Sequence, residues 1–295
     1  MKFISIKNMY DDIRNNSWKI RQLDVSGIIG IPRSGLMAAT LLAQELHLGV
    51  CSVYEFIDNK GNDLVFYRHG NRPIQHKSNN TYLVLEDSIY NGSCIKYINK
   101  LKEKFPDKKF ISCCIYLEGP CLMYKPDTWL VDIRKEALNG EIPVALYQYN
   151  LLDNYWNFKF LYDLDGVMCL DPPCDSNIEA YENYLKNPIP LHVPITPSTN
   201  AISICTYRLK KYEKETKGFL DKVGVNYNKI WMFDSESKET RDLTPPAQYK
   251  ANIYKEHPEY VLFIESNDKE AQDICRLSRK PVYCFTSGKM YSIES

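Results

Sequence analysis

The chain lacks several features that would place it in a specialised class of protein. No apolar run approaches the ~20 residues needed to span a bilayer, and there is neither an internal repeat nor a low-complexity tract. Lys+Arg and Asp+Glu both number 37, and this zero net charge argues against a general nucleic-acid or membrane surface. The ten cysteines include no CxxC pair and no signal-peptide pattern is present, so we expect reduced thiols in a cytoplasmic protein.

What is present is the composition of an ordinary globular protein. Hydrophobic residues make up 44% and charged residues 25% of the 295 residues, and this length predicts two domains. We expect these domains at residues 1–150 and 151–295, with an aromatic, irregular linker over residues 134–157. Hydrophobic patterning also predicts helices over residues 1–22 and 209–222.

The stretch TYLVLEDSIYNGSC, residues 81–94, predicts an anion-binding turn. Residues 82–85 are apolar and predict a buried strand of a parallel sheet that ends at the carboxylates Glu86 and Asp87. A short polar turn and the amphipathic run 95–101, a predicted helix, follow. Free backbone N–H groups and the positive end of a helix dipole would then converge on one point. Two carboxylates beside such a turn suit the hydroxyls of a sugar phosphate, or a magnesium ion on it.

A second strand, loop and helix precede this stretch. Residues 25–30 predict a short buried strand, residues 31–35 (IPRSG) a loop, and residues 36–43 a helix. Gly35 permits close approach of the backbone, and Arg33 offers a bidentate fork for phosphate oxygens.

The two turns, in this order, resemble the binding motifs of type I phosphoribosyltransferases, which use phosphoribosyl pyrophosphate (PRPP). The resemblance implies that Glu86 and Asp87 hold the ribose hydroxyls, that the following turn wraps the 5-phosphate, and that the earlier loop binds pyrophosphate. The PRPP-binding residues implied in this way are Arg33, Ser34, Gly35, Glu86, Asp87, Ser88, Tyr90, Asn91, Gly92, Ser93 and Cys94. An ordinary strand–turn–helix with a solvated acidic end is the alternative interpretation.

Tyr90 is a departure from the family pattern. Purine-salvage members have an aspartate near this position that handles the proton of the base. A tyrosine, with a pKa near ~10, does not act as a carboxylate would. The departure argues against purine salvage and leaves 5-phosphate binding through backbone donors intact.

Residues 51–80, between the two turns, form a polar connection with basic side chains. In this fold class such a segment often forms a flap over the pyrophosphate, where cations would neutralise leaving-group charge. A solvated basic hairpin is the alternative for any one of these residues, and their roles stay open. The residues concerned are Arg68, His69, Arg72, His76 and Lys77.

The second half begins with an acidic strand end. Residues 158–162 predict a strand that leads into the DxDG pattern Asp163-Leu164-Asp165-Gly166, which alone could be a calcium-type loop or a surface turn. The pattern resembles motif I of the haloacid dehalogenase (HAD) superfamily of phosphohydrolases. The resemblance implies that Asp163 is a nucleophile that forms an aspartyl-phosphate, and that Asp165 is the acid/base. Thr206, at the end of the next predicted strand, matches the hydroxyl of motif II.

Two further motifs follow in the order that this family shows. Lys250 is the best candidate for the motif III lysine, and Lys255 is the second. Glu265 ends an apolar strand and Asp268 opens the next helix, which resembles motif IV, although the family usually has aspartate in place of Glu265. The resemblance implies a Mg²⁺ cofactor held by Asp163, Asp165, Glu265 and Asp268. Between motifs I and II there is room for only one short helix, residues 178–185, so we expect a minimal cap and an open site.

The sequence therefore predicts an α/β protein of two doubly wound parallel-sheet domains, phosphoribosyltransferase-like and then HAD-like. The whole chain resembles bacterial fusion proteins of this kind that are linked with surface polysaccharide synthesis. The resemblance implies transfer of 5-phosphoribosyl from PRPP to a hydroxyl acceptor, a glycan or glycolipid, followed by hydrolysis of the 5-phosphate. The alternatives are a nucleobase phosphoribosyltransferase joined to a nucleotidase, and a PRPP-sensing regulator. The acceptor, its linkage, the general base for transfer and the oligomeric state stay open.

Overall fold

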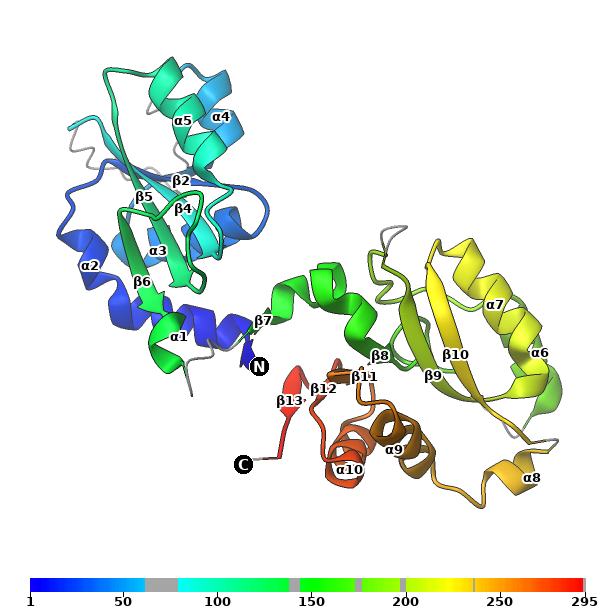
Figure 1. The fold of residues 1–295 in the computed structure, drawn as a ribbon. Coiled ribbons are helices and arrows are strands. Elements are labelled where there is room, and N and C mark those ends of the chain that lie inside the picture. The colour runs from blue at the N-terminus through cyan, green and yellow to red at the C-terminus, as the bar shows by residue number, and fades with distance from the viewer. Residues whose placement is uncertain (62–78, 138–143, 173–176, 197–199, 236, 294–295) are drawn as a thin grey trace. The chain divides into compact units, whose positions relative to one another are not determined.

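The chain folds into two compact units, Met1–Tyr149 and Asn150–Ser295, each built around a mainly parallel sheet (Figure 1). The computed structural model describes residues 1–61, 79–137, 144–172, 177–196, 200–235 and 237–293. None of the helices in these ranges combines the length and the apolar character needed to cross a membrane.

The first unit contains a parallel sheet of five strands in the order β3-β2-β4-β5-β6, and a separate parallel pair, β1 with β7. Its elements are β1 (Lys2–Ile4), α1 (Ile6–Asn16), α2 (Trp18–Arg21), β2 (Gly27–Gly30), α3 (Ser34–Leu46), β3 (Val50–Ser52), α4 (Val53–Asp58), β4 (Thr81–Ile89), α5 (Ile95–Lys104), β5 (Lys109–Leu117), β6 (Thr128–Asp132) and β7 (Ala145–Tyr147). Short 3-10 helices, η2 (Ile133–Glu136) and η3 (Gln148–Asp153), flank β7.

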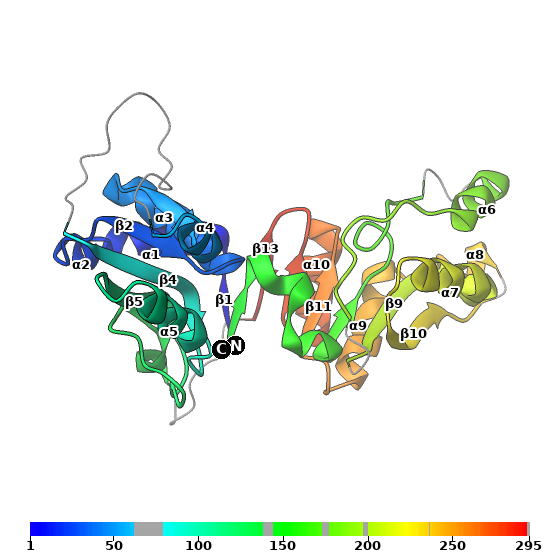
Figure 2. The same ribbon diagram turned by 90° about the horizontal axis from the view of Figure 1, so that it is seen from above.

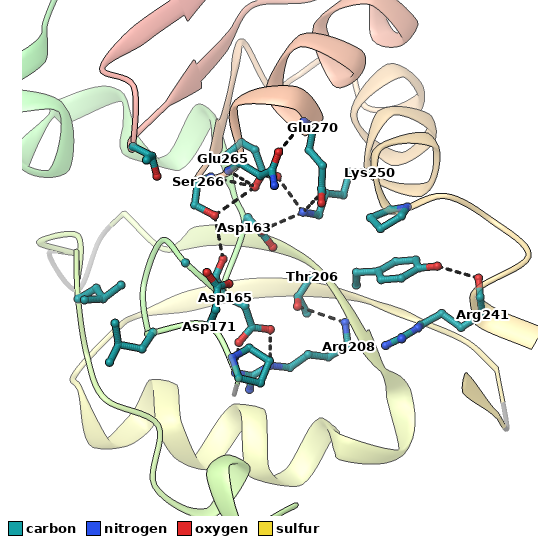
Figure 3. Close-up of a pocket in the computed structure, with 18 of the residues that line it drawn as sticks. Asp163, Asp165, Asp171, Thr206, Arg208, Arg241, Lys250, Glu265, Ser266 and Glu270 are labelled. Carbon is teal, nitrogen blue, oxygen red and sulfur yellow. Dashed lines mark hydrogen bonds and ion pairs between the residues drawn. The ribbon is translucent and has the colours of Figure 1, made fainter. Parts of the chain in front are cut away.

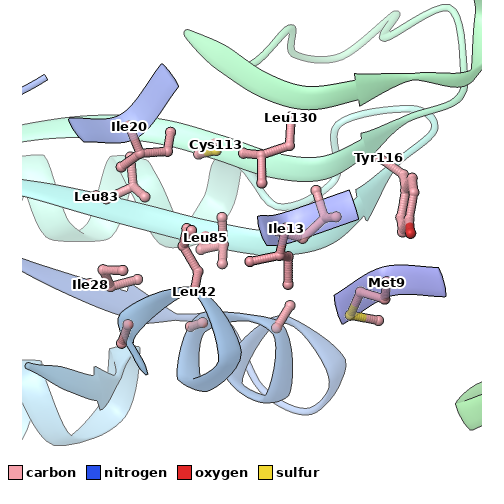
Figure 4. Packing of buried hydrophobic residues seen from close by; sticks show 14 of the residues in the cluster. Met9, Ile13, Ile20, Ile28, Leu42, Leu83, Leu85, Cys113, Tyr116 and Leu130 are labelled. Atoms are coloured by element: carbon pink, nitrogen blue, oxygen red, sulfur yellow. The ribbon is translucent and has the colours of Figure 1, made fainter. Parts of the chain in front are cut away.

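Both faces of this sheet are covered by helices, as its nearly continuous apolar strands predict. Leu83 and Leu85 pack with α1 and α3 on one face, in the cluster drawn in Figure 4. Tyr82 and Val84, which alternate with them along β4, belong to the cluster formed with α4 and α5. The predicted doubly wound α/β class is therefore confirmed for this unit.

The prediction for the N-terminus is wrong in its first residues. A strand, β1, comes before α1, and it pairs with β7 so that Phe3 lies opposite Leu146. A partner so distant along the chain leaves no local pattern in the sequence. Ser5 then caps α1, where its side chain accepts a hydrogen bond from the backbone N–H of Asn8. The segment expected as an irregular linker, residues 134–157, contains β7 and is corrected for the same reason.

Strand β4 is longer than the sequence predicts. It pairs with β5 along its whole length, as far as Ile89 opposite Leu117, so it does not end at Leu85. Glu86 and Asp87 therefore lie within the strand. Their carboxyl groups nevertheless stay close enough to share a hydrogen bond.

The second unit contains a sheet of six strands in the order β10-β9-β8-β11-β12-β13, in which β13 is antiparallel to β12. Its elements are η4 (Tyr155–Lys159), β8 (Phe160–Tyr162), α6 (Ile178–Lys186), β9 (Ile202–Leu209), η5 (Lys210–Tyr212), α7 (Glu213–Lys222), β10 (Tyr227–Phe233), α8 (Lys238–Arg241), α9 (Pro246–Glu256), β11 (Leu262–Glu265), α10 (Asp268–Ser278), β12 (Val282–Cys284) and β13 (Lys289–Tyr291).

Helices cover both faces of this sheet as well. Cys205 and Phe263 pack with α9 and α10 on one face, and Figure 2 shows these two helices beside β11. On the other face, Thr216 of α7 contacts the side chain of Arg208 on β9. The helix predicted over residues 209–222 is corrected at its start, since β9 continues to Leu209 and α7 begins at Glu213.

Candidate active sites

In the first unit the loop after β2 lies against β4. The two strands are neighbours, with Gly30 opposite Leu85, so their carboxyl ends bring the loop and the carboxylates together. A Cβ atom on Gly35 would lie 2.8 Å from the Oε1 atom of Glu86 and 2.9 Å from the carbonyl oxygen of Leu85. Only a glycine permits this approach. Arg33, in the same loop, is exposed.

The carboxylate of Asp87 is held at both oxygens. The Ser34 hydroxyl donates to Oδ1 at 2.7 Å, and the Tyr149 hydroxyl donates to Oδ2 at 2.7 Å. Asp87 is 4% exposed, so these two bonds fix its position in a largely dry environment. Ser34 and Asp87, which the sequence assigns to one site, are therefore in direct contact.

Glu86 has a different electrostatic environment. Burial, and next the negative charge of Asp87, raise the pKa of Glu86 to about 9. At neutral pH Glu86 therefore carries a proton in the free protein and is able to donate a hydrogen bond. Burial also raises the pKa of Glu118, which lies at the end of β5 beside Ser88.

The turn between β4 and α5 is supported by a neighbouring loop. The backbone N–H of Cys121 donates to the carbonyl of Tyr90 at 3.0 Å. Gly92 has φ +88°, and a Cβ atom there would lie 2.2 Å from the carbonyl oxygen of Tyr124, so both its conformation and its surroundings require glycine. Cys94 is buried, and burial raises the pKa of its thiol to about 11.

The remaining predicted residues of this turn, Tyr90, Asn91 and Ser93, are exposed. Tyr90 is 64% exposed. The first turn of α5 receives no side-chain cap from Cys94, the residue before it. Two backbone N–H groups at this end already have partners, since Ile95 donates to the carbonyl of Gly92 at 3.1 Å and Tyr97 donates to that of Cys94 at 3.0 Å. Arg68, His69, Arg72, His76 and Lys77, the residues of the predicted flap, lie outside the described residues.

In the second unit the predicted residues line a cavity of about 930 Å³ (Figure 3). Strand β8 lies between β9 and β11, and all three are parallel, so their carboxyl ends converge on this cavity. The predicted residues that line it are Asp163, Asp165, Thr206, Lys250, Glu265 and Asp268.

The ammonium group of Lys250 lies at the centre of a cluster of carboxylate side chains. Its Nζ atom lies 2.8 Å from Asp163, 2.8 Å from Glu265 and 2.9 Å from Glu270, and Figure 3 shows all three pointing at the lysine. Burial opposes the charge of Lys250, but the surrounding carboxylates raise its pKa well above the usual value. Lys255, the alternative motif III residue, is exposed on the same helix.

Asp163 competes with the lysine for a proton. Burial raises the pKa of Asp163 well above its ordinary range, and Lys250 acts in the opposite direction. With three carboxylates around one ammonium group, the lysine is the group that stays charged. Three ionised carboxylates would exceed the single positive charge of this lysine, and the raised pKa of Asp163 reduces that excess.

The second carboxylate of the DxDG pattern has a partner that the sequence did not reveal. The Nε atom of Arg208 lies 2.8 Å from Oδ2 of Asp165, and its Nη2 atom lies 2.5 Å from Oδ1. Arg208 is 2% exposed. The Tyr184 hydroxyl also donates to Oδ1, at 3.2 Å. Both oxygens of Asp165 are thus engaged, and the pair is neutral as a whole.

The carboxylates predicted to bind metal differ in their surroundings. Oε1 of Glu265 accepts from the backbone N–H groups of Ser266 at 2.8 Å and Asn267 at 3.1 Å. Asp268 is at the edge of the cavity, where its Oδ1 atom accepts from the Tyr291 hydroxyl at 2.6 Å. Asp171 also lines the cavity. Across the described ranges, no three His, Cys, Asp or Glu side chains already converge as a metal site.

Neither a protein-family model nor a curated protein matches the chain. Similar solved structures include a Helicobacter pylori xanthine-guanine-hypoxanthine phosphoribosyltransferase, at 15% identity and a TM-score of 0.36, over 51% of this chain and 92% of that one. A Pyrococcus horikoshii purine phosphoribosyltransferase is similar at 18% identity and a TM-score of 0.34, over 50% of this chain and 91% of the other. An Aeropyrum pernix orotate phosphoribosyltransferase is similar at 16% identity and a TM-score of 0.28, over 43% of this chain and 70% of the other.

Sequence reasoning missed six polar side chains of the two sites. Arg208 was detectable, because it follows Thr206 by two residues on β9 and so shares its face of the sheet. Glu270 was also detectable, since it lies in the first turn of a helix that begins beside Glu265. Glu118 was detectable because it directly follows β5. The other three arrive through tertiary structure and leave no local pattern. They are Tyr149, Asp171 and Tyr184.

Proposed function

We propose that the chain is a bifunctional enzyme whose two units act in series. The first unit transfers 5-phosphoribosyl from PRPP to a hydroxyl acceptor, a glycan or glycolipid, and releases pyrophosphate. The second unit hydrolyses the 5-phosphate and leaves a ribofuranosyl group. The two steps suit each other because the transfer product carries a phosphate monoester, and its hydrolysis makes the sequence irreversible.

The observation that supports this proposal most is that three side chains from different elements line one cavity: Asp163 directly after β8, Thr206 on the neighbouring strand β9, and Lys250 on α9. In the proposed hydrolysis, a carboxylate oxygen of Asp163 attacks phosphorus and the bond from phosphorus to the sugar oxygen breaks. Arg208 binds both oxygens of Asp165 in the free protein, so Asp165 would have to leave Arg208 and take up a proton from water before it protonates the leaving oxygen. Water then hydrolyses the aspartyl-phosphate. Lys250, 2.8 Å from Asp163, holds that carboxylate in place.

The excess of negative charge in the cavity fits a magnesium ion. Three carboxylates surround Lys250, and Arg208 is already paired with Asp165, so a phosphate dianion would meet net repulsion without a further cation. Asp163 and Glu265, together with Asp171 or Asp268 at the edge, would have to move together to hold Mg²⁺, because among the described residues no three such side chains converge in the free protein. The ion would screen the charge of the phosphate.

For the first unit, support comes from the fixed Asp87 and from the glycine-dependent contact between the two turns. An aspartate held by Ser34 and Tyr149 is preorganised to accept hydrogen bonds from ribose hydroxyls. The loop with Arg33 and Gly35 would then bind the pyrophosphate that leaves. Tyr90 is exposed and is not a carboxylate, so the site lacks at that position the acid that purine-salvage enzymes use.

A screen for pyrophosphate release tests the proposal. The protein is incubated with PRPP and Mg²⁺, and either with nucleobases or with mono- and oligosaccharide acceptors. We expect release with a saccharide acceptor and none with nucleobases. Release only with a nucleobase would instead indicate a nucleobase transferase joined to a nucleotidase. PRPP binding without turnover of any acceptor would indicate a PRPP-sensing regulator.

A further inference from the structure

A second cavity of about 440 Å³ adjoins the phosphatase cavity in the second unit. Tyr181, Lys238, Arg241 and Asp242 line both cavities, so the two spaces adjoin along these four side chains. A molecule with its phosphate at Asp163 would reach the second cavity by passing these side chains. Its volume lies in the range of small-ligand sites.

The lining of this second cavity combines aromatic and apolar surface. Tyr181 of α6 and Tyr212 of η5 meet edge to face, with ring centroids 5.4 Å apart. Ile178, on the first turn of α6, is 65% exposed, and Leu209 contributes further apolar surface. Both residues line the cavity, where Tyr181 is 7% exposed and Tyr212 is half-buried, and each combines an aromatic ring with a hydroxyl group.

The charges around the cavity nearly cancel. Arg241 is paired with Asp242, with its Nη2 atom 2.8 Å from Oδ1. Of the remaining lining residues, Lys211 and Lys238 are basic and Glu239 is acidic. A lining of this kind offers both hydrogen-bond donors and acceptors, and it lacks the strong positive field that a polyphosphate would need.

We infer that this cavity is a subsite for the leaving group, and that its occupant is a neutral sugar joined to C1 of ribose 5-phosphate. A sugar presents apolar C–H faces to aromatic rings and hydroxyls to mixed donors and acceptors, which is what Tyr181, Tyr212 and the balanced charges supply. This inference rests on the proposed function and names the substrate class of its second step. The residues that determine the preference are Tyr212 and Tyr181.

The test compares two phosphomonoesters with the full chain and Mg²⁺. One is ribose 5-phosphate, and the other is a synthetic disaccharide with 5-phosphoribofuranose linked to a methyl hexoside. We expect kcat/KM at least about tenfold higher for the disaccharide, equivalent to about 1.4 kcal/mol. Tyr212→Ala should reduce this ratio towards one, and Tyr212→Phe should retain most of it because the ring remains. Tyr155→Ala is the matched control, since Tyr155 is 72% exposed and lies outside the lining of both cavities.

Equal kcat/KM for the two compounds in the wild-type protein would overturn the inference and leave the phosphatase proposal intact. So would a higher kcat/KM for adenosine 5′-monophosphate than for the disaccharide, which would indicate a nucleobase subsite. If the protein hydrolyses none of the three, the phosphatase proposal itself fails and the inference fails with it. A Tyr212→Ala protein that keeps the full preference would also contradict the role given to this ring.

Discussion

Replacing Lys250 by methionine should destabilise the second unit strongly. The substitution keeps the length and apolar volume of the side chain and removes its charge. Lys250 is 3% exposed, and Asp163 and Glu265 contact it within 2.8 Å. Removing one partner of a buried ion pair leaves uncompensated charge and costs about 3–5 kcal/mol in the free energy of unfolding.

The loss in free energy of unfolding caused by Lys250→Met should increase with pH. Burial already raises the pKa of Asp163, and without Lys250 it would rise further in the folded state. A carboxyl group with a raised folded pKa stabilises fully at low pH and loses this contribution as the pH rises through the folded value. The difference between variant and wild type should therefore be small near pH 4 and grow by up to about 1.4 kcal/mol per pH unit above it.

Urea unfolding followed by hydrogen exchange of peptides from residues 150–295 measures this difference for the second unit alone. Lys255→Met is the control, because Lys255 lies on the same helix and is exposed. The double variant Lys250→Met with Glu265→Gln should recover part of the loss, since it removes one unpaired carboxylate. A Lys250→Met protein as stable as the Lys255→Met protein at pH 8 would refute the account of this buried cluster.

Three further predictions concern the first unit. Asp87→Asn should raise the KM for PRPP through a loss of about 1–3 kcal/mol and leave phosphatase activity unchanged; normal PRPP turnover would contradict the assignment. Arg33→Ala should weaken binding of PRPP and pyrophosphate about tenfold or more, but hardly affect binding of ribose 5-phosphate. Equal losses of affinity for all three ligands in calorimetric titration would refute the assignment of Arg33 to pyrophosphate. Burial, and next the charge of Asp87, raise the pKa of Glu86 from 4.5 to about 9 in the folded protein. Its contribution to the free energy of unfolding is therefore lost as the pH rises between these two values. Between these pH values, Glu86→Gln should reduce the dependence on pH of the free energy of unfolding measured in urea. An unchanged dependence on pH would contradict this prediction.

The fold class was predictable because it depends on local patterns. The elements and their parallel arrangement follow from two kinds of local pattern. One is an apolar strand bounded by turns, as at residues 82–85 and 260–264, and the other is an amphipathic run, as at residues 95–101. The ends of strands were less predictable. Strands β4 and β9 extend beyond their apolar runs because neighbouring strands continue to pair with them, to Ile89 in one case and Leu209 in the other.

The candidate sites were predictable where residues follow a strand directly. Asp163 directly follows β8, Glu265 is the last residue of β11, and both line the same cavity. The side chains that hold the other site carboxylates, Asp87 and Asp165, could not be predicted from a position after a strand. Tyr149 reaches Asp87 only because β1 pairs with β7, and Arg208 reaches Asp165 only because β8 and β9 are adjacent. Contacts between distant segments depend on the fold and not on spacing along the chain.

The central claim is that one chain transfers a phosphoribosyl group and then removes its phosphate. Mass spectrometry of the product made by the Asp163→Asn protein from PRPP and the acceptor tests it most directly. This variant lacks the nucleophile of the second unit, so its product should retain the 5-phosphate and be heavier than the wild-type product by one phosphate group. Adding the Asp87→Asn protein, whose second unit is intact, should then complete the hydrolysis. A product of the Asp163→Asn protein that carries no phosphate would contradict the proposed order of the two reactions.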